Sequence, residues 1–309
     1  MNDDNVLAAR FEEARPRLRA VAYRMLGSLD DADDAVQAAW LKASRAGVSD
    51  VRELGAWFTT VTVRQCLDQL RARRRRAEVL LPDDQAMSAF APAVTAADEE
   101  LLRAESVGRA LLVVLGRLSP GQRAAFVLHD LLAMPFDEIG PMLDRSPVAA
   151  KKLASRARQR LQGKPPEDQQ LTAEHFKIAE AFLSASRRGD IAALLELLAA
   201  DVVRKADRVL IPGHAPTEMR GARKVAEGTK MFAAWARAGD VVLIDGTPGI
   251  IIAPAGRLKA VIRLSMHSGS ITAIEVMGDP GRLAATTITL QAAGGRAPAV
   301  RRPLAGGGV

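Results

Sequence analysis

Polar and basic side chains between residues 146 and 159 have the types and spacing needed to contact nucleic acid. Stepped at about 100° per residue, a helix over 147–161 has one apolar side and one polar side. Its apolar side holds Ala150, Leu153, Ala157 and Leu161. The residues that we expect to contact DNA are Ser146, Val148, Lys151, Lys152, Ser155, Arg156, Arg158 and Gln159. Lys and Arg bind phosphates or guanine edges, and Ser and Gln bind base edges, so this face suits a major groove. The alternative is an ordinary helical hairpin with a solvated basic face.

The stretch before this helix completes a predicted helix-turn-helix over residues 135–161. Phe136, Ile139 and Leu143 share one face of a short first helix. Ser146 then supplies the N-cap of the second helix, and a proline follows as its first residue. Pro141 lies inside the first helix, where a proline costs about 3 kcal/mol. We therefore expect that helix to be kinked or shortened.

A second candidate surface lies on the long helix predicted over residues 55–76. Its buried stripe comprises Val63, Leu67 and Leu70. Along another line, an aromatic residue and several arginines recur at helical spacing, which suits stacking of an unpaired base and binding of its phosphates. The residues that we expect to hold single-stranded DNA are Trp57, Arg64, Asp68, Arg71, Arg74 and Arg75. The alternative is a solvated basic helix end, with Trp57 in the core.

An acidic cluster opens another predicted helix. The residues concerned are Asp30, Asp31, Asp33 and Asp34, followed by Gln37 and Trp40. Acidic residues stabilise a helix start in any protein, so capping and solvation alone would explain them. In a chain that binds DNA, however, an acidic surface beside an exposed tryptophan cannot face the phosphates. We therefore expect it to bind a protein partner that carries basic residues.

Composition sets the limits of these predictions. The chain has 309 residues, a net charge of +7 and a sequence pI of about 10.0, which fits a polyanion partner. Cys66 is the sole cysteine, so an intrachain disulfide or a cysteine zinc cluster is excluded, and a buried thiol in a reducing cytoplasm is expected. The beginning of the chain lacks the pattern of a secretory signal, and no stretch suits a membrane span. We expect a soluble cytoplasmic protein.

The chain divides into segments of different composition. We expect a helical domain at 8–77, a mobile acidic linker at 78–104, and a helix-turn-helix domain at 105–162. Residues 172–290 are predicted to form an α+β domain, and residues 294–309 a disordered tail. In the α+β domain, a helical part around 173–199 precedes an antiparallel meander whose strands are 241–244, 249–253, 258–264 and 271–276.

Taken in order, these features resemble regions two and four of the extracytoplasmic-function sigma factors. The matching segments are 33–41, 56–68, 118–123 and 153–158. The resemblance implies that the surface at 30–40 binds the β′ clamp of core RNA polymerase and that the helix-turn-helix domain meets the β flap. It further implies that the helix at 57–76 opens the minus-ten element and that the helix at 147–161 reads the minus-thirty-five element. Such a protein is an initiation factor without a cofactor or catalytic activity, and is expected to be a monomer when free.

Residues 172–290 resemble the SnoaL-like, cone-shaped extension of one subgroup of these factors, in which two short motifs are thought to hold the extension against the sigma domains. The nearest matches here give a predicted regulatory set of Leu81, Pro82, Asp279, Pro280, Arg282 and Leu283. Both motifs are degraded, and the subgroup's glycine-rich motif after Asp207 is replaced. We therefore expect a different or weaker interdomain contact. An anti-sigma partner and a small-molecule ligand of this domain both stay open.

Two rival functions remain at this point. A free-standing repressor or activator would use the same helix-turn-helix, normally as a dimer on a palindrome. A SnoaL-like cyclase or hydrolase fused to a DNA-binding arm would need acid and base groups in its cone. The candidates are His175, His214, His267, Asp207, Asp245 and Asp279. They lack metal-ligand spacing, and the aspartates lie near predicted turns, so surface and turn roles are the simpler interpretation.

Overall fold

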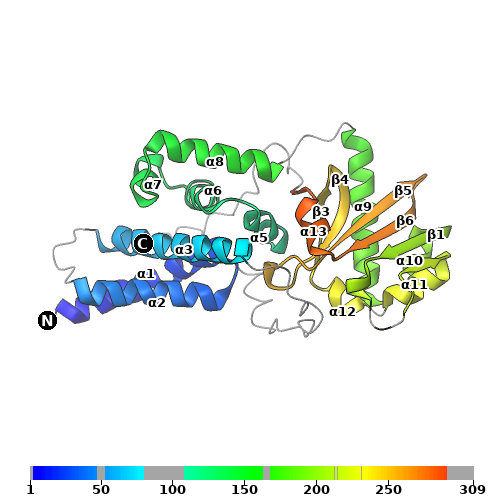
Figure 1. Ribbon diagram of the computed structural model, residues 1–309, viewed down its shortest axis with the longest axis horizontal. Coiled ribbons are helices and arrows are strands. Elements are labelled where there is room, and N and C mark those ends of the chain that lie inside the picture. The colour runs from blue at the N-terminus through cyan, green and yellow to red at the C-terminus, as the bar shows by residue number, and fades with distance from the viewer. Residues whose placement is uncertain are drawn as a thin grey trace, which may run out of the picture.

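The computed structural model describes residues 3–46, 53–79, 108–162, 168–211, 213, 215–230 and 232–290. The elements form an N-terminal helical body (3–79), a middle helical body (108–162) and a C-terminal body built around a sheet (168–290), as Figure 1 shows. Most of the predicted linker, including Leu81 and Pro82, and the predicted tail lie outside the described residues.

The N-terminal body consists of α1 (Asp3–Leu26), α2 (Leu29–Ala46) and α3 (Leu54–Val79). Gly27, with φ of 73°, ends α1 in the left-handed conformation that glycine adopts without steric cost. Leu18, Met25 and Phe58 are among the largest fully buried side chains. Cys66 is buried as predicted, and burial raises the pKa of its thiol to about 12, so the thiol is unreactive.

The middle body contains α5 (Arg109–Gly116), α6 (Pro120–Phe126), the π-helical turn η3 (Val127–Leu131), α7 (Phe136–Met142) and α8 (Pro147–Gln162). Ser119 and Gln122 form a capping box that starts α6. The predicted helix-turn-helix is confirmed as α7 and α8. Pro141 is the penultimate residue of α7, which is short, as its position predicted.

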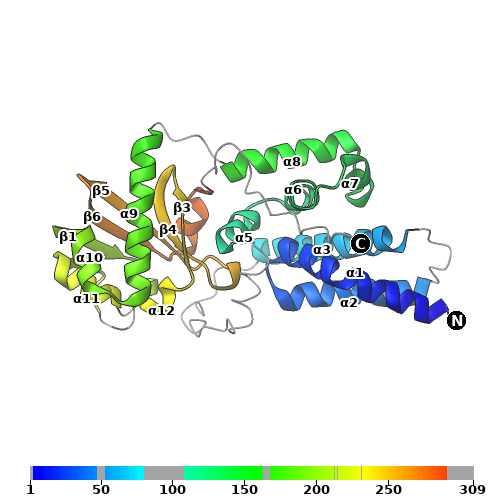
Figure 2. The same cartoon turned by 180° about the vertical axis from the view of Figure 1, so that it is seen from behind.

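The C-terminal body begins with α9 (Gln169–Arg188) and α10 (Ile191–Leu197). Its strands are β1 (Leu198–Ala206), β2 (Glu218–Arg220), β3 (Gly239–Ile244), β4 (Thr247–Ile252), β5 (Ala260–His267), β6 (Ser270–Met277) and β7 (Ile288–Thr289). Its other helical segments are η4 (Arg208–Leu210), α11 (Ala222–Lys230), α12 (Ala233–Ala236), η5 (Pro254–Gly256) and α13 (Pro280–Ala285). The sheet order is β2-β1-β6-β5-β4-β3-β7, and α9 lies across one face of the sheet (Figure 2).

The sheet is mixed, which corrects one prediction. The predicted meander is present, because β3, β4, β5 and β6 pair antiparallel in sequence order. Strand β1 was not predicted, and the expected helix extended to residue 199, whereas α10 ends at Leu197. β1 pairs parallel with β6, with Val203 opposite Ala273. This pairing joins segments that are distant in sequence, so no local pattern could predict it.

The hydrophobic core is continuous across the three bodies. One buried cluster runs from α1, α2 and α3 through the middle body to Val261, Met277 and Ile288 of the C-terminal body. A second cluster lies within the C-terminal body, around Phe182 and Ile250. Among the described helices, none is long and apolar enough to cross a membrane.

Candidate nucleic-acid interface

The turn between α7 and α8 is held by backbone contacts. The Arg145 amide donates to the Gly140 carbonyl at 2.9 Å, and Asp144 has a φ of 54°. A Cβ at Gly140 would lie only 2.9 Å from the Arg145 carbonyl oxygen, so the turn requires a glycine there. The Ser146 hydroxyl accepts from the Ala149 amide at 3.2 Å, which confirms the predicted N-cap of α8.

The outer face of α8 is basic and polar. Its exposed residues include Ser146, Val148, Lys151, Lys152, Ser155, Arg156 and Gln159, which were predicted, and Arg160, which was not and which donates to Gln122 at 3.2 Å. Val148 is 64% exposed, which is unusual for an aliphatic side chain at the start of a helix that packs on a core. This face can offer ammonium, guanidinium, hydroxyl and amide groups to phosphates and base edges.

Arg158 lies elsewhere than predicted. Its guanidinium forms an ion pair with Asp130 at 2.9 Å and is half-buried, so it does not belong to the outward face. Burial raises the pKa of Asp130, and the charge of Arg158 opposes that shift. The helix is rotated slightly from the predicted orientation, because Ala154 is fully buried while Leu153 is only partly buried.

The predicted single-strand surface on α3 is largely solvent-facing. Its exposed members are Arg64, Asp68, Arg71, Arg74 and Arg75. Trp57 is half-buried, with its ring 5.7 Å from that of Phe58 in an edge-on contact. Arg71 pairs with Asp68 at 3.2 Å on the helix surface. The surface therefore presents a row of guanidinium groups beside the partly covered face of an indole.

The two candidate DNA surfaces lie against each other in this structure. Helix α3 runs beneath α6 and α7 in Figure 1, and it contacts both. Arg64 donates from Nη2 to the Pro141 carbonyl at 3.2 Å and to Asp144 Oδ1 at 2.9 Å. A groove between the bodies is lined by basic residues from both sides, including Arg71, Arg74, Arg75 and Arg145.

Arg123 of α6 connects the two bodies from within, and sequence reasoning did not find this role. Its side chain is only 6% exposed, and it donates to the Arg24 carbonyl from Nε at 3.2 Å and from Nη2 at 3.1 Å. Burial lowers the pKa of Arg123 to about 10. Its acceptor near the end of α1 is far away in sequence, so no local pattern could have identified it.

The acidic cluster at the start of α2 is partly used within the N-terminal body. Asp31 pairs with Arg73 at 2.5 Å, and Asp33 pairs with Arg19 at 2.6 Å. Burial tends to raise the pKa of Asp31, but hydrogen bonds with Arg73 and Ser28 outweigh it and lower that pKa. The exposed polar residues that remain for a partner are Asp30, Asp34 and Gln37.

Trp40 was predicted to be exposed, and this prediction is wrong. The side chain is half-buried, and its ring lies 4.9 Å from that of Phe11 on α1. The indole therefore helps to join α2 to α1. Leu41, which is 45% exposed, is instead the apolar side chain that α2 offers to solvent at this position.

The predicted regulatory residues near the end of the chain form the N-cap and first turn of α13. Asp279 caps α13 by accepting from the Arg282 amide at 2.9 Å, and Pro280 is the first helical residue. Arg282 forms ion pairs with Asp207 and Glu275. Leu283 packs against the core cluster that it shares with the helical bodies.

The contact between α13 and the middle body depends on residues that sequence reasoning missed. Arg117 donates to the carbonyls of Leu283 and Thr286, which the end of α13 leaves without helical partners. Arg109 pairs with Asp240 of β3 at 3.2 Å, and the Leu290 amide donates to the Leu161 carbonyl at 3.1 Å. The C-terminal body is thus bonded to both ends of the middle body.

The aspartates among the candidate catalytic residues have structural roles. Asp207 accepts from the amides of Gly278 and Asp279, and these bonds, with Arg282, outweigh burial and lower its pKa. Asp245 pairs with Arg263 and accepts from the Thr287 amide. His267 is exposed, His175 is half-buried, and His214 lies outside the described residues. Across the described ranges, no group of His, Cys, Asp and Glu is arranged to hold a metal ion.

Comparison with known proteins matches both helical bodies. Residues 10–76 match the family Sigma-70 region 2, and residues 108–161 match Sigma-70, region 4. The chain is 30% identical over 290 residues to the probable ECF RNA polymerase sigma factor SigI of Mycobacterium tuberculosis, covering 92% of this chain and 97% of that protein. It is 37% identical over 232 residues to the ECF RNA polymerase sigma factor SigJ of Mycobacterium tuberculosis, covering 70% of this chain and 68% of that protein. The crystal structure of Mycobacterium tuberculosis SigJ aligns with 89% of this chain and 98% of that chain, at 29% identity and a TM-score of 0.44.

Proposed function

Because the chain belongs to the extracytoplasmic-function sigma factors of RNA polymerase, we propose a division of labour among its three bodies. Sigma factors bind core polymerase and promoter DNA, and this chain is a transcription initiation factor without catalytic activity of its own. In our proposal, residues 8–77 open the minus-ten element and residues 105–162 read the minus-thirty-five element. The C-terminal α+β domain, at 172–290, modulates their activity.

The exposed face of α8 is the observation that carries the proposal for the minus-thirty-five element. Lys151, Lys152 and Arg156 supply positive charge for phosphates or guanine, and Ser155 and Gln159 supply hydrogen-bonding groups for base edges. The close turn at Gly140 fixes α8 at the surface of the middle body, which is what insertion into a major groove requires. Arg158 is not among the residues that we propose to contact DNA, because its guanidinium group pairs with the Asp130 carboxylate.

The exposed arginines of α3 support a role in holding the opened minus-ten strand. Guanidinium groups bind backbone phosphates, and the exposed part of Trp57 is suited to stack on a base. Arg64 is occupied by the helix-turn-helix in this structure. We propose that α3 and α7 separate when the protein binds polymerase and promoter, so that both DNA surfaces become available.

Polymerase binding is assigned to the exposed side of α2. Asp30, Asp34 and Gln37 would face basic residues of the β′ clamp, while the helix-turn-helix domain would meet the β flap. Replacing Asp30 and Asp34 with alanine is expected to weaken binding to core polymerase with only a small fall in melting temperature, since Asp30 lies in the first turn of α2. Glu227→Ala on α11, which removes an exposed acidic side chain in the C-terminal body, is the matched control.

Modulation by the C-terminal domain rests on its bonds to the middle body. Arg117 and the Arg109–Asp240 ion pair hold this domain against α5, next to the helix-turn-helix. Arg117→Met and Asp240→Asn are expected to change transcription output, because each loosens that contact while leaving the DNA surfaces intact. Arg223→Met, on the exposed face of α11, is the control. Unchanged output in both variants would contradict a regulatory role.

The deciding experiment is transcription from native promoters by core polymerase with this chain as sole initiation factor. We expect discrete start sites that depend on the chain. The free-standing regulator is distinguished by a binding assay without polymerase, in which it would bind a palindromic duplex tightly as a dimer. Tight binding of that kind, together with no initiation from any native promoter, would overturn the proposal.

A further inference from the structure

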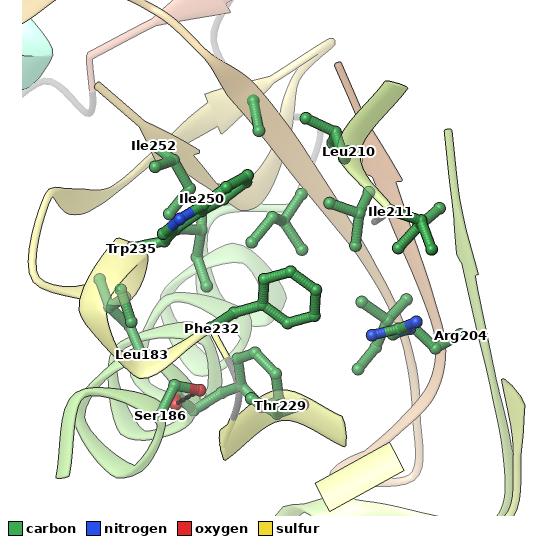
Figure 3. Close-up of a pocket in the computed structure, with 17 residues that line it drawn as sticks. Leu183, Ser186, Arg204, Leu210, Ile211, Thr229, Phe232, Trp235, Ile250 and Ile252 are labelled. Atoms are coloured by element: carbon green, nitrogen blue, oxygen red, sulfur yellow. Dashed lines mark hydrogen bonds between the residues drawn. The ribbon is translucent and has the colours of Figure 1, made fainter. Parts of the chain in front are cut away.

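The C-terminal body contains a small apolar pocket with one charged side chain. It lies between the sheet and helices α9 and α12, and its cavity volume is about 70 Å³ (Figure 3). Its walls include Leu183, Phe232, Trp235, Ile250 and Ile252. Among such walls a polar ligand group needs a specific protein partner, since an unpaired polar group loses its hydration there.

The hydroxyl groups in the pocket wall are already used by their own helices. The Ser186 hydroxyl donates to the Phe182 carbonyl at 2.7 Å. The Thr229 hydroxyl donates to the Val225 carbonyl at 2.8 Å. Neither hydroxyl proton is directed to a ligand, so the guanidinium group of Arg204 is the charged donor in the described lining.

Arg204 projects from β1 into this pocket and is only 6% exposed. Figure 3 shows its guanidinium group beside the ring of Phe232, and the two centres are 5.7 Å apart. Its Nε is buried without a hydrogen-bond partner, and no carboxylate of the described residues forms an ion pair with it. The ring offers partial compensation through its π-face, but it cannot accept the planar array of N–H groups.

A buried guanidinium is costly when its Nε lacks a hydrogen-bond partner and its charge meets an aromatic ring in place of a carboxylate. Burial lowers the pKa of Arg204, but an arginine remains charged at neutral pH. A leucine or methionine at this place would fill the same space without the desolvation penalty. An anion with an apolar body fits this pocket, because its charge would pair with Arg204 and its apolar part would contact the apolar walls.

We propose that the pocket binds a short aliphatic monocarboxylate, whose carboxylate pairs with Arg204 and whose alkyl chain lies among Leu183, Phe232 and Ile250. Guanidinium and carboxylate groups match in planar, two-bond geometry. A cavity of about 150 Å³ is known to accept benzene, so the present volume favours a smaller alkyl body. Inorganic anions such as phosphate or chloride would lose their hydration without gaining contacts from the apolar walls.

The test uses the full chain without polymerase, and compares propanoate with the matched neutral amide, propanamide. Binding is followed by titration calorimetry. We expect the acid to bind at least tenfold more tightly than the amide, and Arg204→Met to weaken the acid at least tenfold. Arg204→Lys should retain part of the affinity, and the exposed Arg223→Met should behave as the wild type. Equal affinity for acid and amide, an unaffected Arg204→Met variant, or no binding of the acid at millimolar concentration would each overturn the proposal.

A second measurement distinguishes a ligand site from a structural role. Without ligand, Arg204→Met should melt at a higher temperature than the wild type, because it removes an unpaired charge from an apolar site. A lower melting temperature would mean that Arg204 serves the fold, and would count against the proposal. The inference goes beyond promoter recognition, and because both measurements use the free protein, its failure would leave the proposed function unaffected.

Discussion

Replacing Gly140 with alanine tests whether the turn of the helix-turn-helix is as close as the structure has it. The added Cβ would lie 2.9 Å from the Arg145 carbonyl oxygen, 3.0 Å from the Pro147 nitrogen and 3.2 Å from the Ser146 carbonyl carbon. These are all backbone atoms of the turn, so no side-chain rotation can relieve the contacts. The variant fits only if α8 moves away from α7.

The expected magnitude follows from two opposing effects. Alanine in place of glycine within a helix is by itself favourable by about 1 kcal/mol. Overpacking of a rigid site costs about 1–3 kcal/mol. We therefore expect Gly140→Ala to lower the free energy of unfolding of the middle body by roughly 0–2 kcal/mol. The matched control is Gly116→Ala at the end of α5, where a Cβ meets nothing within 4 Å, and it should be neutral or slightly stabilising.

Urea denaturation followed by circular dichroism gives the stability difference, and hydrogen exchange locates it. The Arg145 amide closes the turn and the Ala150 amide forms a hydrogen bond at the start of α8. Both amides should exchange faster in Gly140→Ala than in the wild type, and their exchange rates should not change in Gly116→Ala. If α8 reads the major groove as we propose, transcription from a cognate promoter should also fall, because a displaced α8 would no longer fit that groove. A Gly140→Ala protein that matches the wild type in stability and exchange would refute the close approach.

Three further predictions concern charged side chains. Lys151→Ala and Lys152→Ala should each weaken promoter binding and lower the slope of log affinity against log salt concentration by about one. The slope is measured from transcription over a series of salt concentrations. An unchanged slope would contradict a contact between these lysines and DNA phosphates. Arg158→Ala should cost about 1–3 kcal/mol at pH 7 by leaving Asp130 unpaired, and adding Asp130→Asn should restore urea stability; failure of that rescue would contradict the pairing. Asp31→Asn should lower the free energy of unfolding at pH 7, but should have no effect at a pH well below the ordinary aspartate pKa of about 3.9. The pKa of Asp31 is lowered in the folded protein, so this residue stabilises the fold only while its carboxylate is charged. Equal losses at both pH values, measured by urea denaturation, would contradict this last mechanism.

Sequence reasoning succeeded where the signal is local. The N-cap at Ser146, the proline after it and the spacing of the apolar residues on α8 all act within a few residues, so the helix-turn-helix could be predicted. The alternating strands of the meander are local in the same sense. The order of these elements along the chain then identified the family.

The failures depend on partners that are distant in sequence. Arg158 has a helical-wheel position compatible with the outer face, but Asp130 on η3 draws its side chain inward. Trp40 was assigned to solvent because Phe11, its ring partner, lies on another helix. The role of Arg123 needed an acceptor carbonyl at Arg24, and that of Arg204 needed the fold of the whole pocket. Such contacts exist only after the bodies assemble.

The contacts between the N-terminal and middle bodies differ in strength, and this difference bears on how the two DNA surfaces become available. Arg64 and Asp144 form an exposed pair, and such pairs contribute about 0–1 kcal/mol, so DNA phosphates can replace Asp144 at little cost. Arg123 is buried, and separating it from the Arg24 carbonyl leaves both groups to be solvated or paired again. Promoter DNA alone can therefore compete with Asp144 for Arg64. It cannot offset the cost of separating the buried Arg123 from the Arg24 carbonyl. In our proposal, the bodies separate when a partner binds a larger surface of both of them, and that partner is core polymerase.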